Sequence, residues 1–265
     1  AERARTGELI RPVLRGRDVG RFHAQWAGLW LVYISWHFPL PEEEWTVVDA
    51  LGRQVHRPDL LQAAERAFAE QYPALYAYLQ QHEVGLRARN KEEVGRRYEW
   101  YALQRYGAEY TGGFRRPKMI WKRVGSKLRF CYDESGMLSL DSTCIAVGNQ
   151  LKYLCCLLNS RMGHYLLQDA PTTGTGDLLV SVQAIEPLLI PLPQDDSLDR
   201  LFDQLTGVCS DVACRVAPQS NRGKPKEHPA ADLGDAQRQL EAACYALYGL
   251  DGEEIAYIEA CVGRD

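Results

Sequence analysis

No apolar run in this chain is long enough to cross a membrane. The longest candidate, WAGLWLVYISWHF at residues 26–38, falls short of the ~18 residues that a spanning helix needs. No hydrophobic region follows the polar, basic N-terminus, so we expect no signal peptide. The sequence has no Cys-x-x-Cys, and no cysteine or histidine pair has zinc-ligand spacing. We therefore expect a cytoplasmic protein with no membrane contact, no metal site and buried, reduced cysteines.

The common catalytic motifs are also missing. No GxGxxG follows a predicted strand, and no Gly-x4-Gly-Lys-Ser/Thr occurs, which excludes the usual dinucleotide and phosphate loops. The absence of Asn-Pro and Pro-Pro removes the Asn/Asp-Pro-Pro-Tyr/Phe motif of amino-methyltransferases. No lysine follows an acidic residue at two positions, so the common metal-nuclease signature is absent. We expect no catalysis and no cofactor in this chain.

Charge is present but unevenly distributed. The formal net charge is −4. Residues 84–130 contain thirteen Lys or Arg against four Glu, whereas residues 177–265 contain seven basic residues against sixteen acidic ones. Such asymmetry favours a basic face for a polyanion and an acidic part that is solvated or binds a partner. The alternative is that the basic loops only solvate the surface.

Hydrophobic periodicity predicts an α+β protein, with a mixed α/β domain at residues 1–193 and a mostly helical part at 194–265. Strands are expected at residues 29–36 and 117–124, at two or three places within 129–148, and at two within 178–193. Helices are expected at residues 57–82 with a break at Pro73, 149–167 with Asn149 as N-cap, 196–216, 233–250 and 251–262. Residues 168–177 and about 217–231 are expected to form flexible loops.

Two groups of basic residues are candidates for nucleic-acid contact. In LIRPVLRGRDVGRF at residues 9–22, Arg15 and Arg17 flank Gly16 and would point the same way in an extended segment. For Arg17 the alternative is an ion pair with Asp18 or another nearby carboxylate. The second group lies on or beside the predicted strand: Arg115, Arg116, Lys118, Lys122, Arg123 and Lys127. Such side chains bind phosphates, and guanidinium groups also match base edges.

Aromatic residues accompany this second basic group. Trp100, Tyr101 and Trp121 have the apolar surface that nucleic-acid proteins use to stack on bases. Buried aromatic residues are more often part of a core, however, and we expect these three to be core residues.

The order of motifs resembles a known family, the TaqI-like C-terminal specificity domain. The resemblance covers nearly the whole chain and depends on successive segments: LIRPVLRGRDVGRF, WYALQR, PKMIWKRV, FCYDESGMLSLDSTCIAV, LKYLCCLLNSRMGHYLL, LLIPLP and LEAACYALYGLDGEEIAYIE. That family supplies target recognition to type IIG restriction–modification enzymes and to related adenine methyltransferases that exclude bacteriophages.

The resemblance implies a double-stranded DNA recognition module for restriction–modification or phage defence. It further implies an upstream adenine-specific methyltransferase domain in the same polypeptide, which would bind S-adenosylmethionine and flip the target base. The chain would then be a specificity fragment of a larger enzyme that can also have endonuclease activity. Segment 115–123 and the loop at 172–177, with Thr172, Thr173 and Thr175, match regions that can face DNA.

Two other functions stay open on the sequence alone. The chain can be a protein-interaction or scaffold module that docks a partner subunit through its acidic helical tail. It can also be a complete enzyme with an unrecognised site, for which methyl transfer by the chain alone would be the test.

Overall fold

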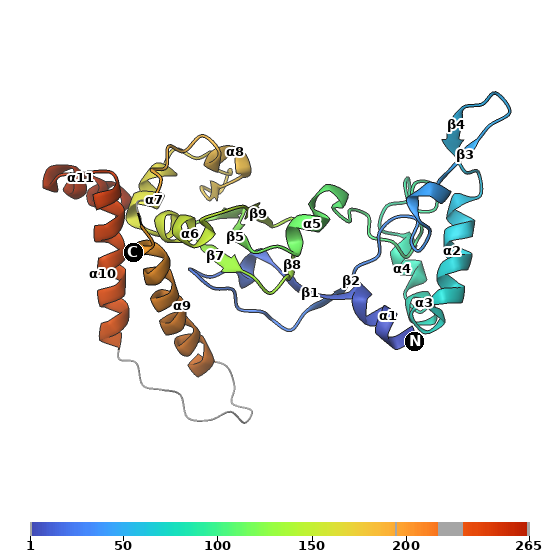
Figure 1. Ribbon diagram of the computed structural model, residues 1–265, viewed down its shortest axis with the longest axis horizontal. Coiled ribbons are helices and arrows are strands. Elements are labelled where there is room, and N and C mark those ends of the chain that lie inside the picture. Colours follow the sequence, from blue (N-terminus) through green and yellow to red (C-terminus); the bar gives the residue numbers. More distant parts are fainter. Residues whose placement is uncertain (1, 194, 217–229, 264–265) are drawn as a thin grey trace. The chain divides into compact units, whose positions relative to one another are not determined.

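The structure is a computed structural model that describes residues 2–193, 195–216 and 230–263. Figure 1 labels its helices and strands. Contacts divide the chain into two compact units, which we describe separately. Unit 1 comprises the residues up to Pro12 and Trp30–Thr111, and unit 2 comprises Val13–Leu29 and the residues from Gly112 onward. This division differs from the expected boundary at residue 193, because the helices after that residue share a core with the preceding sheet.

Unit 1 is mainly helical and has an aromatic core. Pro73 opens a helix, where its missing N–H costs no hydrogen bond, so the predicted break is confirmed. Trp100 and Tyr101 lie in the core, as expected. The strand expected at residues 29–36 is only three residues long. The elements of unit 1 are α1 (Glu2–Leu9), the first part of β1 (Ile10–Leu14), β2 (Trp30–Val32), η2 (Glu42–Glu44), β3 (Thr46–Val48), β4 (Gln54–His56), α2 (Leu60–Gln71), α3 (Pro73–Gln80), α4 (Glu83–Arg87) and η3 (Ala108–Tyr110).

Unit 2 is built on a three-stranded antiparallel sheet of order β7-β5-β9. Met119 and Trp121 of the central strand face one core cluster and Ile120 faces another, as the alternation predicts. Two smaller pairings flank this sheet: β1 runs parallel to β8, and β10 antiparallel to β6. The strands and short helices are η1 (Gly16–Asp18), α5 (Thr111–Phe114), β5 (Lys118–Lys122), β6 (Val124–Gly125), β7 (Phe130–Asp133), β8 (Leu138–Ser139), β9 (Thr143–Val147) and β10 (Leu178–Leu179).

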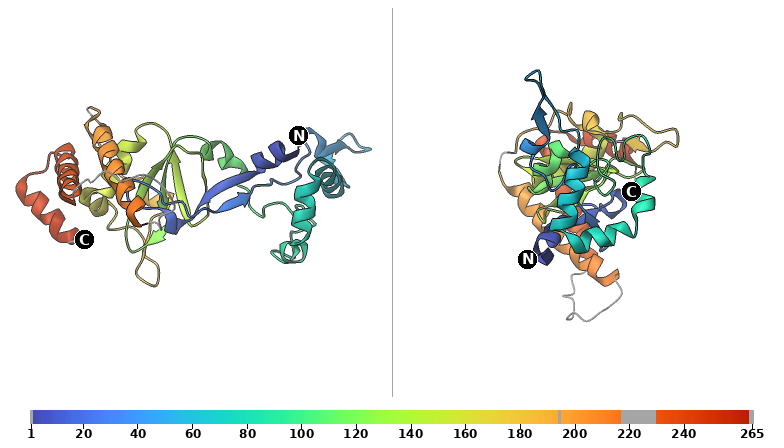
Figure 2. Two further views of the ribbon diagram at one scale, coloured as in Figure 1. Left: turned by 90° about the horizontal axis from the view of Figure 1, so that it is seen from below. Right: turned by 90° about the vertical axis from the view of Figure 1, so that its right-hand side faces the viewer.

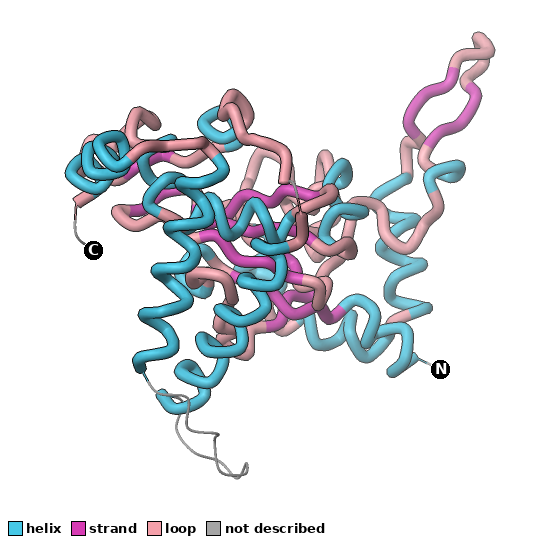
Figure 3. Tube along the Cα trace, turned by 60° about the vertical axis from the view of Figure 1, so that its left-hand side comes forward, coloured by secondary structure: helices cyan, strands magenta, loops and turns pink. Residues whose placement is uncertain are grey.

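Helices cover one side of this sheet. Among the five longer ones, α9 and α10 lie side by side and α9 packs on α6 (Figures 1 and 3). The helix expected at residues 149–167 is two helices, because Ser160 is extended and its side chain caps the second. The first is preceded by Gln150 rather than by an Asn149 cap. The helices are α6 (Leu151–Asn159), α7 (Arg161–Leu166), α8 (Val182–Ile185), α9 (Ser197–Val216), α10 (Ala230–Leu247) and α11 (Gly252–Val262).

The secondary structure predicted for the C-terminal part of the chain is confirmed in part. The helices expected after residue 195 are present, and acidic residues occupy the first turn of α11. Of the two strands expected at residues 178–193, β10 forms, but the helix α8 follows it and no second strand is present in that described segment. The expected loop near 217–231 lies outside the described residues, apart from residues 230 and 231, which begin α10.

Two kinds of feature are absent from the described residues. No helix there is both long and apolar enough to span a membrane. The same residues contain no group of three or more His, Cys, Asp or Glu side chains that could hold a metal ion.

Candidate nucleic-acid interface

Ser142 joins two basic segments that are far apart in the sequence. Its hydroxyl accepts a hydrogen bond from the backbone N–H of Gly16 at 3.0 Å. Its carbonyl oxygen accepts one from the N–H of Arg123, also at 3.0 Å. A Cβ on Gly16 would lie 3.0 Å from that carbonyl oxygen and 3.2 Å from Cγ of Lys122. A side chain at this position would therefore crowd the contact that sets η1 against the end of β5.

This contact brings the backbone segments of three exposed cations close together, and we call Arg17, Lys122 and Arg123 the basic corner. Arg17 lies in η1, Lys122 ends β5, and Arg123 follows directly. Among the described residues, no carboxylate oxygen forms an ion pair, at 4 Å or less, with any of these three side chains. Their positive charges therefore face solvent.

Arg15 has a different role from the one expected. Its guanidinium donates to both carboxylate oxygens of Asp18, at 2.7 and 2.9 Å, and its backbone N–H donates to one of them. Hydrogen bonding from Arg15 lowers the pKa of Asp18. The ion pair considered for Arg17 is thus made by Arg15, whose charge is matched within its own turn.

Lys118 does not fit the expectation of a DNA contact. Its side chain is 0% exposed, because β5 turns it into the core. The ammonium group pairs with Asp133, which is its cross-strand neighbour on β7, and donates to the carbonyl oxygen of Phe114 at 2.9 Å. A buried and paired ammonium cannot reach a phosphate, so Lys118 is a structural residue.

The remaining basic candidates lie away from the corner. Arg115 and Arg116 are exposed just before the start of β5, whereas Lys122 ends that strand. The four steps along the strand correspond to ~13 Å at ~3.3 Å per residue. Lys127 is exposed in the connection from β6 to β7. Arg115 and Arg116 therefore lie near one end of β5, and Lys122 and Arg123 lie at the other.

The positive stretch at residues 84–130 is divided between the two units. Its first part belongs to unit 1, where Arg87 pairs with Glu83 and Arg97 with Glu93. There Arg89 donates to the carbonyl oxygens of residues 100 and 102, at 2.8 Å each. Several of these charges are thus engaged within unit 1 itself.

Residues 172–177 form a closed turn, which we call the threonine hairpin. The N–H of Thr173 donates to the carbonyl oxygen of Asp177 at 2.8 Å, and its hydroxyl contacts that of Thr175 at 2.8 Å. Thr172 forms a bridge with Leu178. The loop expected here is thus closed by hydrogen bonds, and Thr172 and Thr175 are exposed.

The threonine hairpin adjoins the basic corner. β10, which follows the hairpin, pairs with β6, and the N–H of Val180 donates to the carbonyl oxygen of Arg123 at 2.9 Å. The fold thus connects the hairpin, through β10, to the backbone of Arg123. Sequence reasoning missed Ser142, which positions the basic corner, and Asp133, which neutralises Lys118, because neither lies in a basic segment.

The chain belongs to the TaqI-like C-terminal specificity domain family, whose profile matches residues 11–179. No curated protein matches the chain. Among solved structures it is similar to the type IIL restriction-modification enzyme MmeI, determined in complex with DNA, at 12% sequence identity and a TM-score of 0.48. That match covers 96% of this chain but only 31% of the MmeI chain.

Proposed function

We propose that this chain is a sequence-specific, double-stranded DNA recognition module of a restriction–modification system. Membership of a specificity-domain family supports the class of function. The observation that carries the proposal is the basic corner with the threonine hairpin beside it. Such a site supplies the two ingredients of DNA recognition, charge for the backbone and hydrogen-bonding groups for bases.

The basic corner binds phosphates in this proposal. Arg17, Lys122 and Arg123 each neutralise one phosphate and release its counterions, which gives affinity independent of sequence. Arg115 and Arg116 bind the same duplex further along, beyond the far end of β5, whose own length of ~13 Å corresponds to about four base pairs at ~3.4 Å each. Lys127 is a further phosphate contact.

The threonine hairpin reads bases. Thr172 and Thr175 present hydroxyl groups that donate and accept hydrogen bonds, and their methyl groups can contact thymine. Thr173 supports them, because its hydroxyl is engaged in the turn. The guanidinium groups of Arg17 and Arg123 can add bidentate contacts to guanine.

The module directs an adenine-specific methyltransferase to its site. In this proposal the chain is not catalytic, and a methyltransferase domain of the same polypeptide binds S-adenosylmethionine and flips the adenine, because the amine is inaccessible in the base stack. The parent enzyme is of type IIG, can also cleave DNA, and acts in the cytoplasm in defence against phages.

Selection from a random duplex library tests the proposal. The full chain should enrich one short consensus, and a variant with Arg17, Lys122 and Arg123 replaced by glutamine should bind much less DNA in every round. Arg96→Gln is the control, since Arg96 is an exposed arginine of unit 1. An output pool without consensus, with no gel shift at low salt, would show that the chain is not a DNA reader.

A further inference from the structure

The hairpin of β3 and β4, residues 46–56, projects from the helices of unit 1 and has no third strand (Figures 1 and 2). We call it the β3–β4 arm. Asp49 closes its tip, because its carboxylate accepts from the N–H groups of Leu51 and Arg53 at 2.9 Å each. In a two-stranded ribbon each strand leaves one edge of N–H and C=O groups unpaired, and such edges can accept another strand.

The outer part of the arm is apolar although it is exposed. Val48 is 69% exposed and Leu51 is 75% exposed, and Val47 is exposed beside them. Val47 pairs across the ribbon with Val55, so Val48 points to the opposite face. Clustered exposed apolar residues on a projecting ribbon are typical of an interaction site rather than of a solvated loop.

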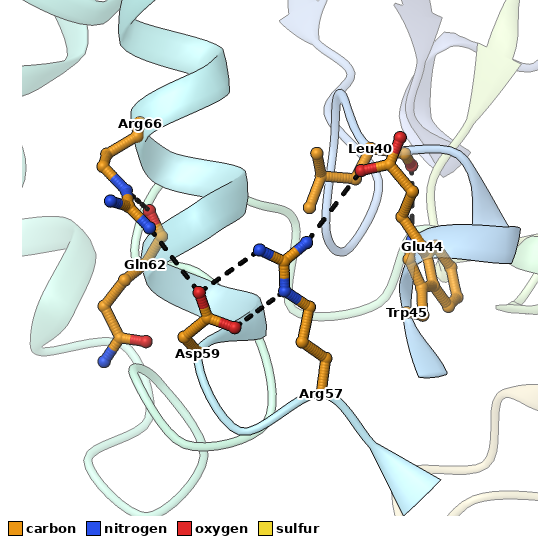
Figure 4. A network of polar contacts seen from close by, with 7 residues as sticks. All are labelled: Leu40, Glu44, Trp45, Arg57, Asp59, Gln62 and Arg66. Atoms are coloured by element: carbon orange, nitrogen blue, oxygen red, sulfur yellow. Dashed lines mark hydrogen bonds and ion pairs between the residues drawn. The ribbon is translucent and has the colours of Figure 1, made fainter. Parts of the chain in front are cut away.

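The root of the arm is held in place by a polar network (Figure 4). Arg57, directly after β4, donates its backbone N–H to the carbonyl oxygen of Trp45 at 2.9 Å. Its guanidinium pairs with Asp59 at 2.7 Å and reaches Glu44 at 4.0 Å. The Trp45 ring donates to the carbonyl oxygen of Leu40 at 3.2 Å. A root fixed before binding reduces the ordering entropy that a partner must overcome.

Charge at the root indicates the chemistry of the partner. Glu42, Glu43 and Glu44 are consecutive and exposed. Residues 41–56 contain four acidic residues and one arginine, a formal charge of −3. This charge repels a DNA backbone and attracts a cationic surface.

We propose that the β3–β4 arm is a docking element for another protein, whose binding surface combines an apolar recess with a rim of lysine or arginine. Val48 and Leu51 enter the recess, the free strand edge pairs with the partner's backbone, and the three glutamates face its basic rim. This interaction is separate from the proposed DNA recognition and does not depend on it.

Site-specific cross-linking tests the docking. The full chain with p-benzoylphenylalanine in place of Leu51 is expressed in the cells that naturally produce it and irradiated. We expect one discrete adduct with a different protein. Cross-linking to DNA, to a second copy of this chain, or to nothing would overturn the proposal.

The second test measures binding of this chain to the partner protein that the cross-link identifies, after that partner has been purified on its own. Val48→Asp and Leu51→Asp should each weaken binding at least tenfold. Replacing Glu42 and Glu43 by glutamine, which leaves the contact of Glu44 with Arg57 intact, should weaken binding and reduce its salt dependence. Val84→Asp is the matched control, because Val84 is 87% exposed on α4 and lies outside the arm. Equal binding by wild type and Leu51→Asp would also overturn the proposal. DNA binding by Leu51→Asp should be unchanged, which separates this result from a failure of the DNA proposal.

Discussion

Replacement of Arg17, Lys122 and Arg123 by glutamine removes the charge of the basic corner and tests its proposed contact with DNA. All three side chains are exposed and have no ion pair with a described carboxylate, so the fold does not depend on their charges. We expect the free energy of unfolding to change by less than about 0.5 kcal/mol, the usual range for surface substitutions. Any loss of DNA binding then reports on the interface itself.

The magnitude follows from counterion release. Each neutralised phosphate contributes about 0.9 to the slope of log affinity against log salt, so three contacts contribute about 2.7. Between about 50 and 200 mM salt, a span of about 0.6 log unit, those three contacts account for about a 40-fold loss of affinity. The triple variant should lack this part of the salt dependence and bind most weakly, relative to wild type, at low salt.

Fluorescence anisotropy with a labelled duplex, titrated at several salt concentrations, measures both slopes. The matched control replaces Lys91, Arg96 and Arg105 by glutamine, which changes the net charge equally. These three residues are also exposed, but they lie in unit 1. The control separates contact at the corner from the effect of overall charge.

Two results would refute the reasoning. If the triple variant keeps the wild-type slope, the basic corner does not contact phosphates. If the control lowers the slope as much as the triple variant does, the effect comes from net charge, and the position of the corner has no special role.

Three further predictions concern the residues that shape unit 2. Lys118→Met should lower the free energy of unfolding in urea by about 3–5 kcal/mol, because it leaves a buried carboxylate without its cation. A second change, Asp133→Leu, should restore most of the loss. A loss below about 1 kcal/mol for Lys118→Met would contradict the pairing. Gly163→Ala should cost about 1–3 kcal/mol or more by the same measurement, since its Cβ would lie 2.3 Å from a backbone oxygen of the preceding helix; an unchanged midpoint would show that this packing is looser. Because the pKa of Asp18 is lowered in the fold, its pair with Arg15 should stabilise the protein at neutral pH. This stabilisation should be lost as the pH falls from the ordinary aspartate pKa through the lower folded-state pKa. Arg15→Gln should reduce that pH dependence of stability, and an identical pH profile would contradict the pairing.

Local patterns in the sequence were sufficient for much of the fold. The alternation of Met119, Ile120 and Trp121 identified β5 and its two buried faces, because side-chain direction in a strand depends only on position. Pro73 marked a helix boundary for a similarly local reason. These predictions required no knowledge of which segments meet.

The site depends on pairings that no local pattern contains. The sequence predicts Lys118 to be a surface cation like Lys122, and only the register of β5 with β7 places Lys118 opposite Asp133. Gly16 and Ser142 are 126 positions apart, and nothing in either segment predicts their contact. Counting charges along the chain therefore identified the basic residues but not which of them are neutralised.

The missing strand at residues 186–193 shows how an alternating pattern can mislead. Leu188 and Ile190 pack against the core while Leu189 and Leu192 are exposed. This alternation arises from an extended segment that lies on the core. Tyrosine hydroxyl groups, rather than a neighbouring strand, donate to its carbonyl oxygens at residues 189 and 191. Period-two hydrophobicity indicates extended backbone, and a sheet additionally requires a partner strand.

Different bonds position the two parts of the proposed DNA interface, the basic corner that would contact phosphates and the threonine hairpin that would contact bases. Backbone and hydroxyl contacts to Ser142 position the basic corner, and none of them involves the threonine hairpin. The hairpin is closed by main-chain bonds and by the hydroxyl of Thr173, which contacts that of Thr175, so the exposed Thr172 can be exchanged without opening the turn. A module built in this way can change the sequence it reads while its charge-dependent affinity stays the same, because base contacts and phosphate contacts contribute to binding separately.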